Sequence, residues 1–108
     1  MVPASATEHL FVYGTLQDEM VQQDVFLRKP KAHPDSLIGY TLSQEKVADI
    51  YPVIVNSNDP SDQIIGKVYT LTHNELLRAD AYEGGAYQRI KVTLNSGNQA
   101  WVYIEKPI

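Results

Sequence analysis

A carboxylate at the end of an expected helix is the side chain best placed for chemistry. Thr72 and Glu75 have the spacing of a capping box, which predicts a helix from about His73 to Tyr82. Glu83 follows at the C-terminal end, where helix carbonyls carry partial negative charge and basic residues are usual. The helix end, nearby Asp80 and any burial would each raise the pKa of Glu83 toward the range of a general base. The alternative is a solvated surface glutamate in a turn.

A glycine after the first expected strand is the second candidate. Residues 10–13 are apolar and favour a strand, which breaks at Gly14. Glycine there permits a positive φ or a close approach to a ligand. Backbone N–H groups of Gly14, Thr15 and Leu16 at the strand tip could bind a carboxylate or a developing oxyanion. The alternative is an ordinary strand followed by a turn.

Short strands dominate the rest of the chain. We expect strands at about residues 9–13, 36–43, 51–55, 63–71, 87–94 and 99–105, and a short helix at 18–27. Residues 1–7 read as a loose tail, 28–35 as a connection, and 56–62 and 95–98 as turns, while 44–50 fit no element clearly. Gly66 indicates a bulge or bend, and Gly84 or Gly85 a left-handed helix stop. No βαβ repeat is present, so a doubly wound parallel sheet is disfavoured. A small, mostly antiparallel barrel with one or two flanking helices fits this order.

Length and composition narrow the class of protein. The 108 residues fit one domain, residues 1–108, and the hydrophobic and charged fractions of 44% and 20% are ordinary for a globular protein. The absence of cysteine excludes disulfides and a thiolate nucleophile, and leans mildly toward a cytoplasmic location. A net charge of −4 with scattered basic residues argues against nucleic-acid binding. We expect neither a signal peptide nor a membrane-spanning segment.

Motifs for other kinds of site are missing. His9, His33 and His73 lack a metal-ligand spacing such as H-x-x-x-H, so we read them as unrelated and expect no metal site. The sequence has no Gly-x-Ser-x-Gly elbow, and Gly14 does not belong to a phosphate-binding loop.

Several short motifs together resemble the γ-glutamylcyclotransferase superfamily, including its AIG2-like branch. They appear in the family's order along nearly the whole chain: Tyr13-Gly14-Thr15-Leu16, Tyr51-Pro52, Gly66-Lys67-Val68-Tyr69, Asp80-Ala81-Tyr82-Glu83-Gly84, Tyr87-Gln88-Arg89 and Ala100-Trp101-Val102-Tyr103. Ala79 departs from the family's usual Leu before the Asp, at a position we expect to serve packing.

The resemblance implies an enzyme of α+β barrel type that needs no cofactor. In the family reaction, the α-amine of a γ-glutamyl substrate attacks its own γ-carbonyl, forming 5-oxoproline and releasing an amine, a cyclising acyl transfer of the lyase or transferase class. Glu83 would be the base, and the loop at Gly14, Thr15 and Leu16 would hold the substrate. The runner-up is a non-catalytic module that binds a small molecule or a partner on the same fold.

Aromatic and basic side chains complete the expected site. Four tyrosines can line the pocket, although each could equally be a half-buried strand aromatic: Tyr13, Tyr82, Tyr87 and Tyr103. Arg89 could neutralise a substrate carboxylate or pair with a surface acid.

Overall fold

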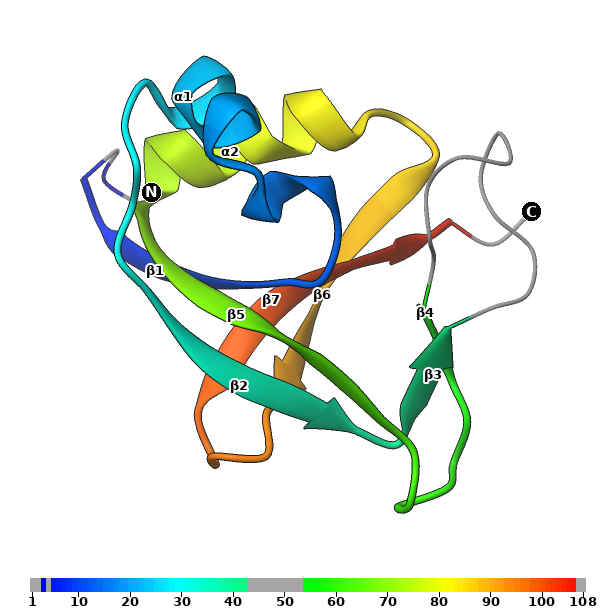
Figure 1. Cartoon of the computed structure of the whole chain (residues 1–108). Coiled ribbons are helices and arrows are strands. Elements are labelled where there is room, and N and C mark those ends of the chain that lie inside the picture. Colours follow the sequence, from blue (N-terminus) through cyan, green and yellow to red (C-terminus); the bar gives the residue numbers. More distant parts are fainter. Residues whose placement is uncertain (1–2, 4, 43–53, 107–108) are drawn as a thin grey trace.

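The protein is an α+β fold in which two helices lie on one face of a mixed sheet (Figure 1). The computed structural model describes residues 3, 5–42 and 54–106. The elements in chain order are β1 (Thr7–Val12), a 3₁₀ turn η1 (Thr15–Gln17), α1 (Glu19–Phe26), β2 (Ala32–Ile38), β3 (Tyr40–Leu42), β4 (Ile54–Asn56), β5 (Gln63–Thr72), α2 (His73–Glu83), β6 (Tyr87–Thr93) and β7 (Gln99–Glu105).

The main sheet has the strand order β2-β5-β1-β7-β6. Only β1 and β7 run parallel; the other neighbours are antiparallel. Strands β3 and β4 form a separate antiparallel pair. The turn after β6 reaches the opposite outer strand, because Asn95 N–H donates to the Ser36 carbonyl of β2 at 2.9 Å. This contact links the two outer strands at one end, but strand pairing that would close a barrel is not seen in the described ranges.

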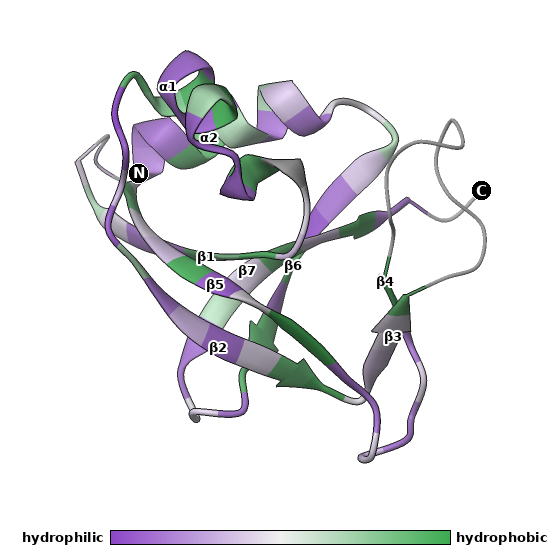
Figure 2. Cartoon of the chain, viewed as in Figure 1, coloured by the Kyte–Doolittle hydropathy of each residue, from purple (hydrophilic) through white to green (hydrophobic). Residues whose placement is uncertain are grey.

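The sheet separates two apolar clusters because successive side chains of a strand point to opposite faces. Leu10 of β1 and Leu71 of β5 pack with Leu76 of α2 on the helix-covered face. Phe11 and Val68 lie in the second cluster, together with residues of β2, β4 and β7. Figure 2 shows that both helices carry hydrophilic and hydrophobic residues, as expected for helices packed on a sheet by one face.

The beginning of the sheet differs from the sequence expectation. Strand β1 starts at Thr7, which pairs with Thr72, so Thr7 belongs to the sheet rather than to a loose tail. Strand β2 starts at Ala32, so the expected connection over 28–35 is wrong in its second half. Pro34 favoured a connection here, but β2 is an outer strand of the sheet, where a missing backbone N–H is tolerated.

The expected strand over 36–43 is broken in two at Gly39, whose φ is +84°. Of the expected strand over 51–55, residues 54 and 55 lie in β4, which continues to Asn56. Residues 51–53 lie outside the described residues, as do the unassigned residues 44–50.

The close approach of β1 to β5 explains why residue 66 is a glycine. A Cβ atom there would lie 2.4 Å from the Val12 carbonyl oxygen and 2.8 Å from Phe11 Cζ. The β2–β5 register runs without interruption through the Asp35–Gly66 pair, so the expected bulge is wrong. Glycine serves close backbone approach here.

The remaining elements agree well with the sequence. Helix α2, strands β5, β6 and β7 and the turn between β6 and β7 lie within about a residue of the expected bounds. No helix in the described part of the chain is long and apolar enough to cross a membrane.

Candidate active site

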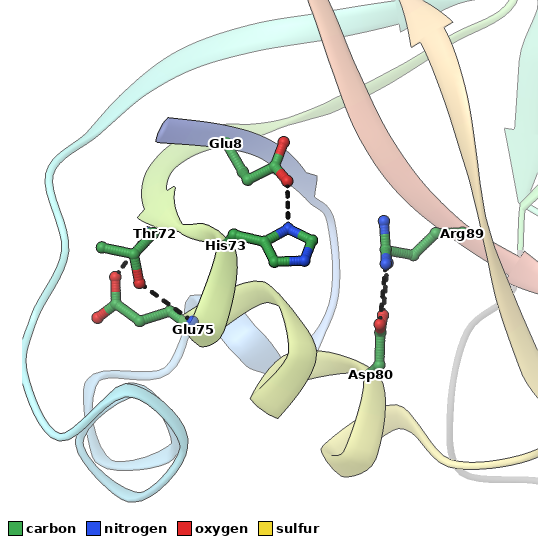
Figure 3. A network of polar contacts seen from close by, with 6 residues as sticks. All are labelled: Glu8, Thr72, His73, Glu75, Asp80 and Arg89. Carbon is green, nitrogen blue, oxygen red and sulfur yellow. Dashed lines mark hydrogen bonds and ion pairs between the residues drawn. The ribbon is translucent and has the colours of Figure 1, made fainter. Parts of the chain in front are cut away.

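A capping box fixes the start of helix α2, as the sequence predicts. The Glu75 N–H donates to Thr72 Oγ1 at 3.1 Å, and the Thr72 N–H donates to Glu75 Oε1 at 2.9 Å. Arg28, which follows α1, donates to both Glu75 oxygens at 2.7 Å. Nearby, His73 Nδ1 lies 2.7 Å from the Glu8 carboxylate of β1 (Figure 3). The helix is therefore held at this end by β1 and by the segment after α1.

A second set of polar contacts holds the other end of the helix. Arg89 of β6 donates from Nε and Nη2 to the two Asp80 oxygens at 2.5 and 2.9 Å (Figure 3). The Tyr103 hydroxyl of β7 donates to Asp80 Oδ1 at 2.7 Å. Burial and this hydrogen bond raise the pKa of Tyr103. The last turn of α2 is thus tied to both strands of the β6–β7 hairpin.

Glu83 is the last residue of α2, three residues after Asp80. Burial raises the pKa of its carboxyl to about 7, within the working range of a general base. Burial accounts for this rise, and the contribution that the sequence predicted from Asp80 is not found. In the structure the Asp80 carboxylate is engaged by Arg89 and Tyr103.

The helix ends at Gly84 with φ +81° and ψ −172°. The predicted position of the stop is confirmed, but the expected left-handed helical conformation is wrong, because the ψ angle of Gly84 lies outside that region. Its N–H donates to the Asp80 carbonyl at 3.0 Å.

Tyr13 brings the end of β1 to the same region. Its hydroxyl donates to the Tyr103 carbonyl at 2.9 Å. Burial chiefly raises the pKa of Tyr13, and the charges of Tyr87 and Glu83 raise it further. The Glu83 charge also contributes to the raised pKa of Tyr103. The charge of Glu83 therefore acts on both Tyr13 and Tyr103, and the charge of Tyr87 acts on Tyr13.

The turn after Tyr13 is held by a buried side chain and by a hydrogen bond from α1. Leu16 is buried in the helix-side cluster, and its carbonyl accepts from Gln22 Nε2 at 2.8 Å. Thr15 and Leu16 begin the 3₁₀ turn η1, and the first N–H groups of such a turn have no partner inside it. That these groups bind an anion stays a prediction.

One of the two reasons expected for Gly14 is wrong. It is not among the positive-φ glycines of the described residues, so a positive φ does not explain it, and the close approach to a ligand stays a prediction. A Cβ atom at Gly14 would meet no atom within 4 Å. The position therefore opens onto free space, which suits a ligand more than a conformational requirement.

A surface depression of about 490 Å³ adjoins the end of α2. Its lining residues are Asp80, Gly84, Tyr87, Gln88, Arg89, Trp101, Tyr103 and Lys106. Three of the expected site residues are among them, whereas Glu83, Tyr13 and residues 14–16 are not. The expectation that Glu83 and the 14–16 turn act on one bound substrate therefore stays a prediction.

Tyr82 lies apart from this depression, whereas Arg89 lines it. Tyr82 is 40% exposed and does not line this depression. Arg89 pairs with Asp80 and lies 4.6 Å from the Trp101 ring centroid, so the structure favours pairing with an acid over binding a substrate carboxylate.

The sequence did not predict the contacts that Asp80 and Trp101 make in the structure. Asp80 and Arg89 lie in adjacent motifs, and their opposite charges were the available signal. Lys91 Nζ lies 4.5 Å from the same Trp101 ring centroid, and only the pairing of β6 with β7 could reveal this contact. Ala79 is fully buried in the helix-side cluster, in agreement with the packing role expected for it.

Comparison with known proteins identifies the family. Residues 10–107 match the family described as "Gamma-glutamyl cyclotransferase, AIG2-like". A protein of Methanocaldococcus jannaschii, named "Putative gamma-glutamylcyclotransferase MJ1514", is 34% identical over 105 residues, covering 89% of this chain and 82% of its own. "AIG2-like protein A" of Arabidopsis thaliana is 35% identical over 85 residues, covering 78% of this chain. This chain spans half the length of that Arabidopsis relative.

Solved structures agree in fold. The solution structure of an Arabidopsis thaliana protein matches with a TM-score of 0.79 at 30% identity, covering 95% of this chain and 71% of the other. A structure titled "Gamma-glutamyl cyclotransferase" matches with a TM-score of 0.65 at 22% identity, covering 93% and 67%. The chain belongs to the AIG2-like γ-glutamylcyclotransferase family.

Proposed function

We propose that the protein is an enzyme that cyclises the γ-glutamyl group of a small molecule to 5-oxoproline and releases an amine. The proposal rests on family membership and on Glu83, a carboxyl at a helix end whose pKa is raised to about 7 by burial. A group with such a pKa accepts a proton near neutral pH and can return it.

The proposed reaction needs one proton carrier. Glu83 takes a proton from the substrate's α-ammonium, and the freed amine attacks the γ-carbonyl carbon to close a five-membered ring. The carbonyl oxygen gains negative charge in the tetrahedral intermediate. The C–N bond to the leaving amine then breaks as Glu83 passes its proton to that nitrogen. Glu83, now ionised again, takes the second proton from the ring nitrogen and hands it to the released amine or to water, so that the lactam keeps one N–H and the base is regenerated. No cofactor is required.

The turn after β1 supplies the binding part of the proposal. Backbone N–H groups of residues 14–16 would hold either the α-carboxylate or the developing oxyanion, since preorganised donors of this kind stabilise both. A Cβ atom at Gly14 would meet no atom within 4 Å, so the position leaves room for a ligand beside the turn. Holding the substrate in its ring-closing conformer could supply up to roughly 7–11 kcal/mol of the barrier reduction.

Turnover of γ-glutamyl compounds tests the proposal directly. The protein is incubated with γ-glutamyl amino acids, γ-glutamyl peptides, ε-(γ-glutamyl)lysine and γ-glutamyl alkylamines, and 5-oxoproline is measured by mass spectrometry. We expect release from at least one class, with loss of at least about 10²-fold in Glu83→Gln. Glu19→Gln is the matched control, because Glu19 is exposed on α1 and pairs with Lys29 alone among the described residues.

Two outcomes would count against this function. Glu83→Gln turnover within a few-fold of the wild type would remove Glu83 from the base role. Saturable binding of the γ-glutamyl compounds without any 5-oxoproline would instead support a non-catalytic binding module on the same fold.

A further inference from the structure

Helix α1 buries a glutamine among apolar side chains. Gln22 is only 1% exposed, and the next buried positions of the helix, Val25 and Phe26, belong to the helix-side apolar cluster. The following residue of the same type, Gln23, is exposed. Moving an amide out of water is unfavourable unless other hydrogen bonds replace those that water made. A glutamine at this position therefore needs hydrogen-bond partners inside the protein.

Only one end of the Gln22 amide has such a partner. Nε2 donates to the Leu16 carbonyl at 2.8 Å, whereas Oε1 is buried with no hydrogen-bond partner in the described part of the chain. Tyr69 is close, since the Gln22 amide partly offsets the rise that burial causes in the pKa of this phenol, but no hydrogen bond of ordinary geometry reaches Oε1. An unpaired buried acceptor costs more than one neutral hydrogen bond usually contributes. Gln22 is thus a poor choice for stability, and its bond to Leu16 is what distinguishes it from an apolar residue.

That bond holds the turn between β1 and α1. Leu16 lies in η1, and the N–H of the next residue, Gln17, donates to the Gly14 carbonyl at 3.1 Å. The Leu16 carbonyl, in contrast, is held from α1, whose start is capped by Asp18. Fixing this carbonyl in the core sets the direction of its peptide group, and hence the directions in which the preceding N–H groups of the turn face.

We propose that Gln22 is a positioning residue for the 14–16 turn, which it holds so that the backbone N–H groups of the turn face a bound carboxylate or oxyanion. The inference rests on the proposed function, in which this turn binds the substrate. Gln22 itself touches no substrate and acts through the Leu16 carbonyl. Donors stabilise a developing charge best when they are oriented before the ligand arrives, and a buried anchor supplies that orientation.

The test replaces Gln22 by a side chain of similar length that cannot donate. Gln22→Met is compared with the wild type and with the matched control Gln23→Met, one position along the same helix. Labelled protein is titrated with 5-oxoproline and followed by the amide NMR signals of Thr15 and Leu16. The kcat/KM is measured with the γ-glutamyl compound that the wild type turns over best, and urea unfolding shows that each variant is folded under the assay conditions.

We expect Gln22→Met to bind 5-oxoproline at least about tenfold more weakly and to lose at least about tenfold in kcat/KM, because misplacing a binding group by about 1 Å can cost up to about 10²-fold. Its stability should stay close to that of the wild type, since the substitution removes the unpaired oxygen together with the hydrogen bond. Gln23→Met should match the wild type in all three measurements. In the wild type, the Gln22 side-chain NH₂ signals should shift with 5-oxoproline and saturate together with those of Thr15 and Leu16, because linked hydrogen bonds polarise one another.

Several results would overturn the proposal. Wild-type affinity and kcat/KM in folded Gln22→Met would show that the glutamine serves packing alone, whatever its effect on stability. Equal losses in Gln23→Met, or Gln22 NH₂ signals that do not move at saturation, would also contradict it, and the second result needs no variant. Failure of the proposed function is distinct: a wild type that binds 5-oxoproline but forms none would not be the enzyme, while weaker binding by Gln22→Met would still support the positioning role.

Discussion

Replacing Glu83 with Gln should stabilise the protein at alkaline pH while it removes the proposed base. Burial raises the pKa of this carboxyl from 4.5 to about 7 in the folded chain. In the unfolded chain the group ionises near 4.5, so folding is disfavoured increasingly as pH rises from about 4.5 to 7, and the penalty is constant above that. Below pH 4.5 both states hold the proton, and the penalty is absent.

The size of this effect follows from the shift. At 1.36 kcal/mol per pH unit, the full shift corresponds to roughly 3 kcal/mol. Glu83 is only partly buried, so solvent screening reduces the figure, and we expect about 1–2 kcal/mol. Gln has a similar shape and stays neutral, so the variant lacks this penalty.

Urea unfolding at pH 4 and pH 8 measures the difference. The free energy of unfolding of Glu83→Gln should exceed that of the wild type by about 1–2 kcal/mol at pH 8, and the difference should largely vanish at pH 4. The kcat/KM of the wild type for an active substrate should rise with pH through an apparent pKa near 7, because the free base is the ionised form. A stability difference that is the same at both pH values would refute the reasoning, since it could not come from this ionisation.

Three further predictions concern local geometry. Gly66→Ala should lower the free energy of unfolding by about 1–3 kcal/mol in urea melts, because its Cβ would overlap the Val12 carbonyl. The control Gly85→Ala, whose Cβ meets nothing within 4 Å, should change the free energy of unfolding little. Equal effects of the two substitutions would contradict the overlap. Gly14→Ala should unfold like the wild type yet form 5-oxoproline more slowly, because its methyl group projects into open space at the proposed ligand position; full activity would place the ligand elsewhere. Thr72→Ala should cost about 1 kcal/mol of stability through loss of the cap, and Thr72→Ser, which keeps the hydroxyl, should restore most of it.

Local sequence signals predicted some elements well and failed at others for identifiable reasons. The capping box at Thr72 and the glycine at 84 act within a few residues, so the bounds of α2 could be read directly. Pro34 by itself favours a connection, but a strand at the sheet edge tolerates proline, so the outcome depends on where the strand lies in the sheet. That property belongs to the strand order, which no local pattern contains. The same holds for Gly66. A glycine is needed there because the backbone of Val12, at the end of β1, lies too close for a side chain.

The candidate site shows the same division. The sequence by itself determined the residue types: the order of family motifs, a carboxylate at a helix end, and a glycine after a strand. These features depend only on residues that are close together in the chain, and together they indicated the family. The tertiary structure alone decided how Glu83 titrates, because the rise of its pKa comes from burial, which depends on elements distant in the chain.

Tertiary structure also decided which charged and polar groups meet. Asp80 was expected to act on Glu83, but the strand register of β6 and β7 gives its carboxylate to Arg89 and Tyr103 instead. His9 and His33 are separated by 23 intervening residues and share no motif, yet pairing of β1 and β2 with β5 places them at one cavity. Long-range strand pairing sets these distances, and a single sequence carries no local record of it.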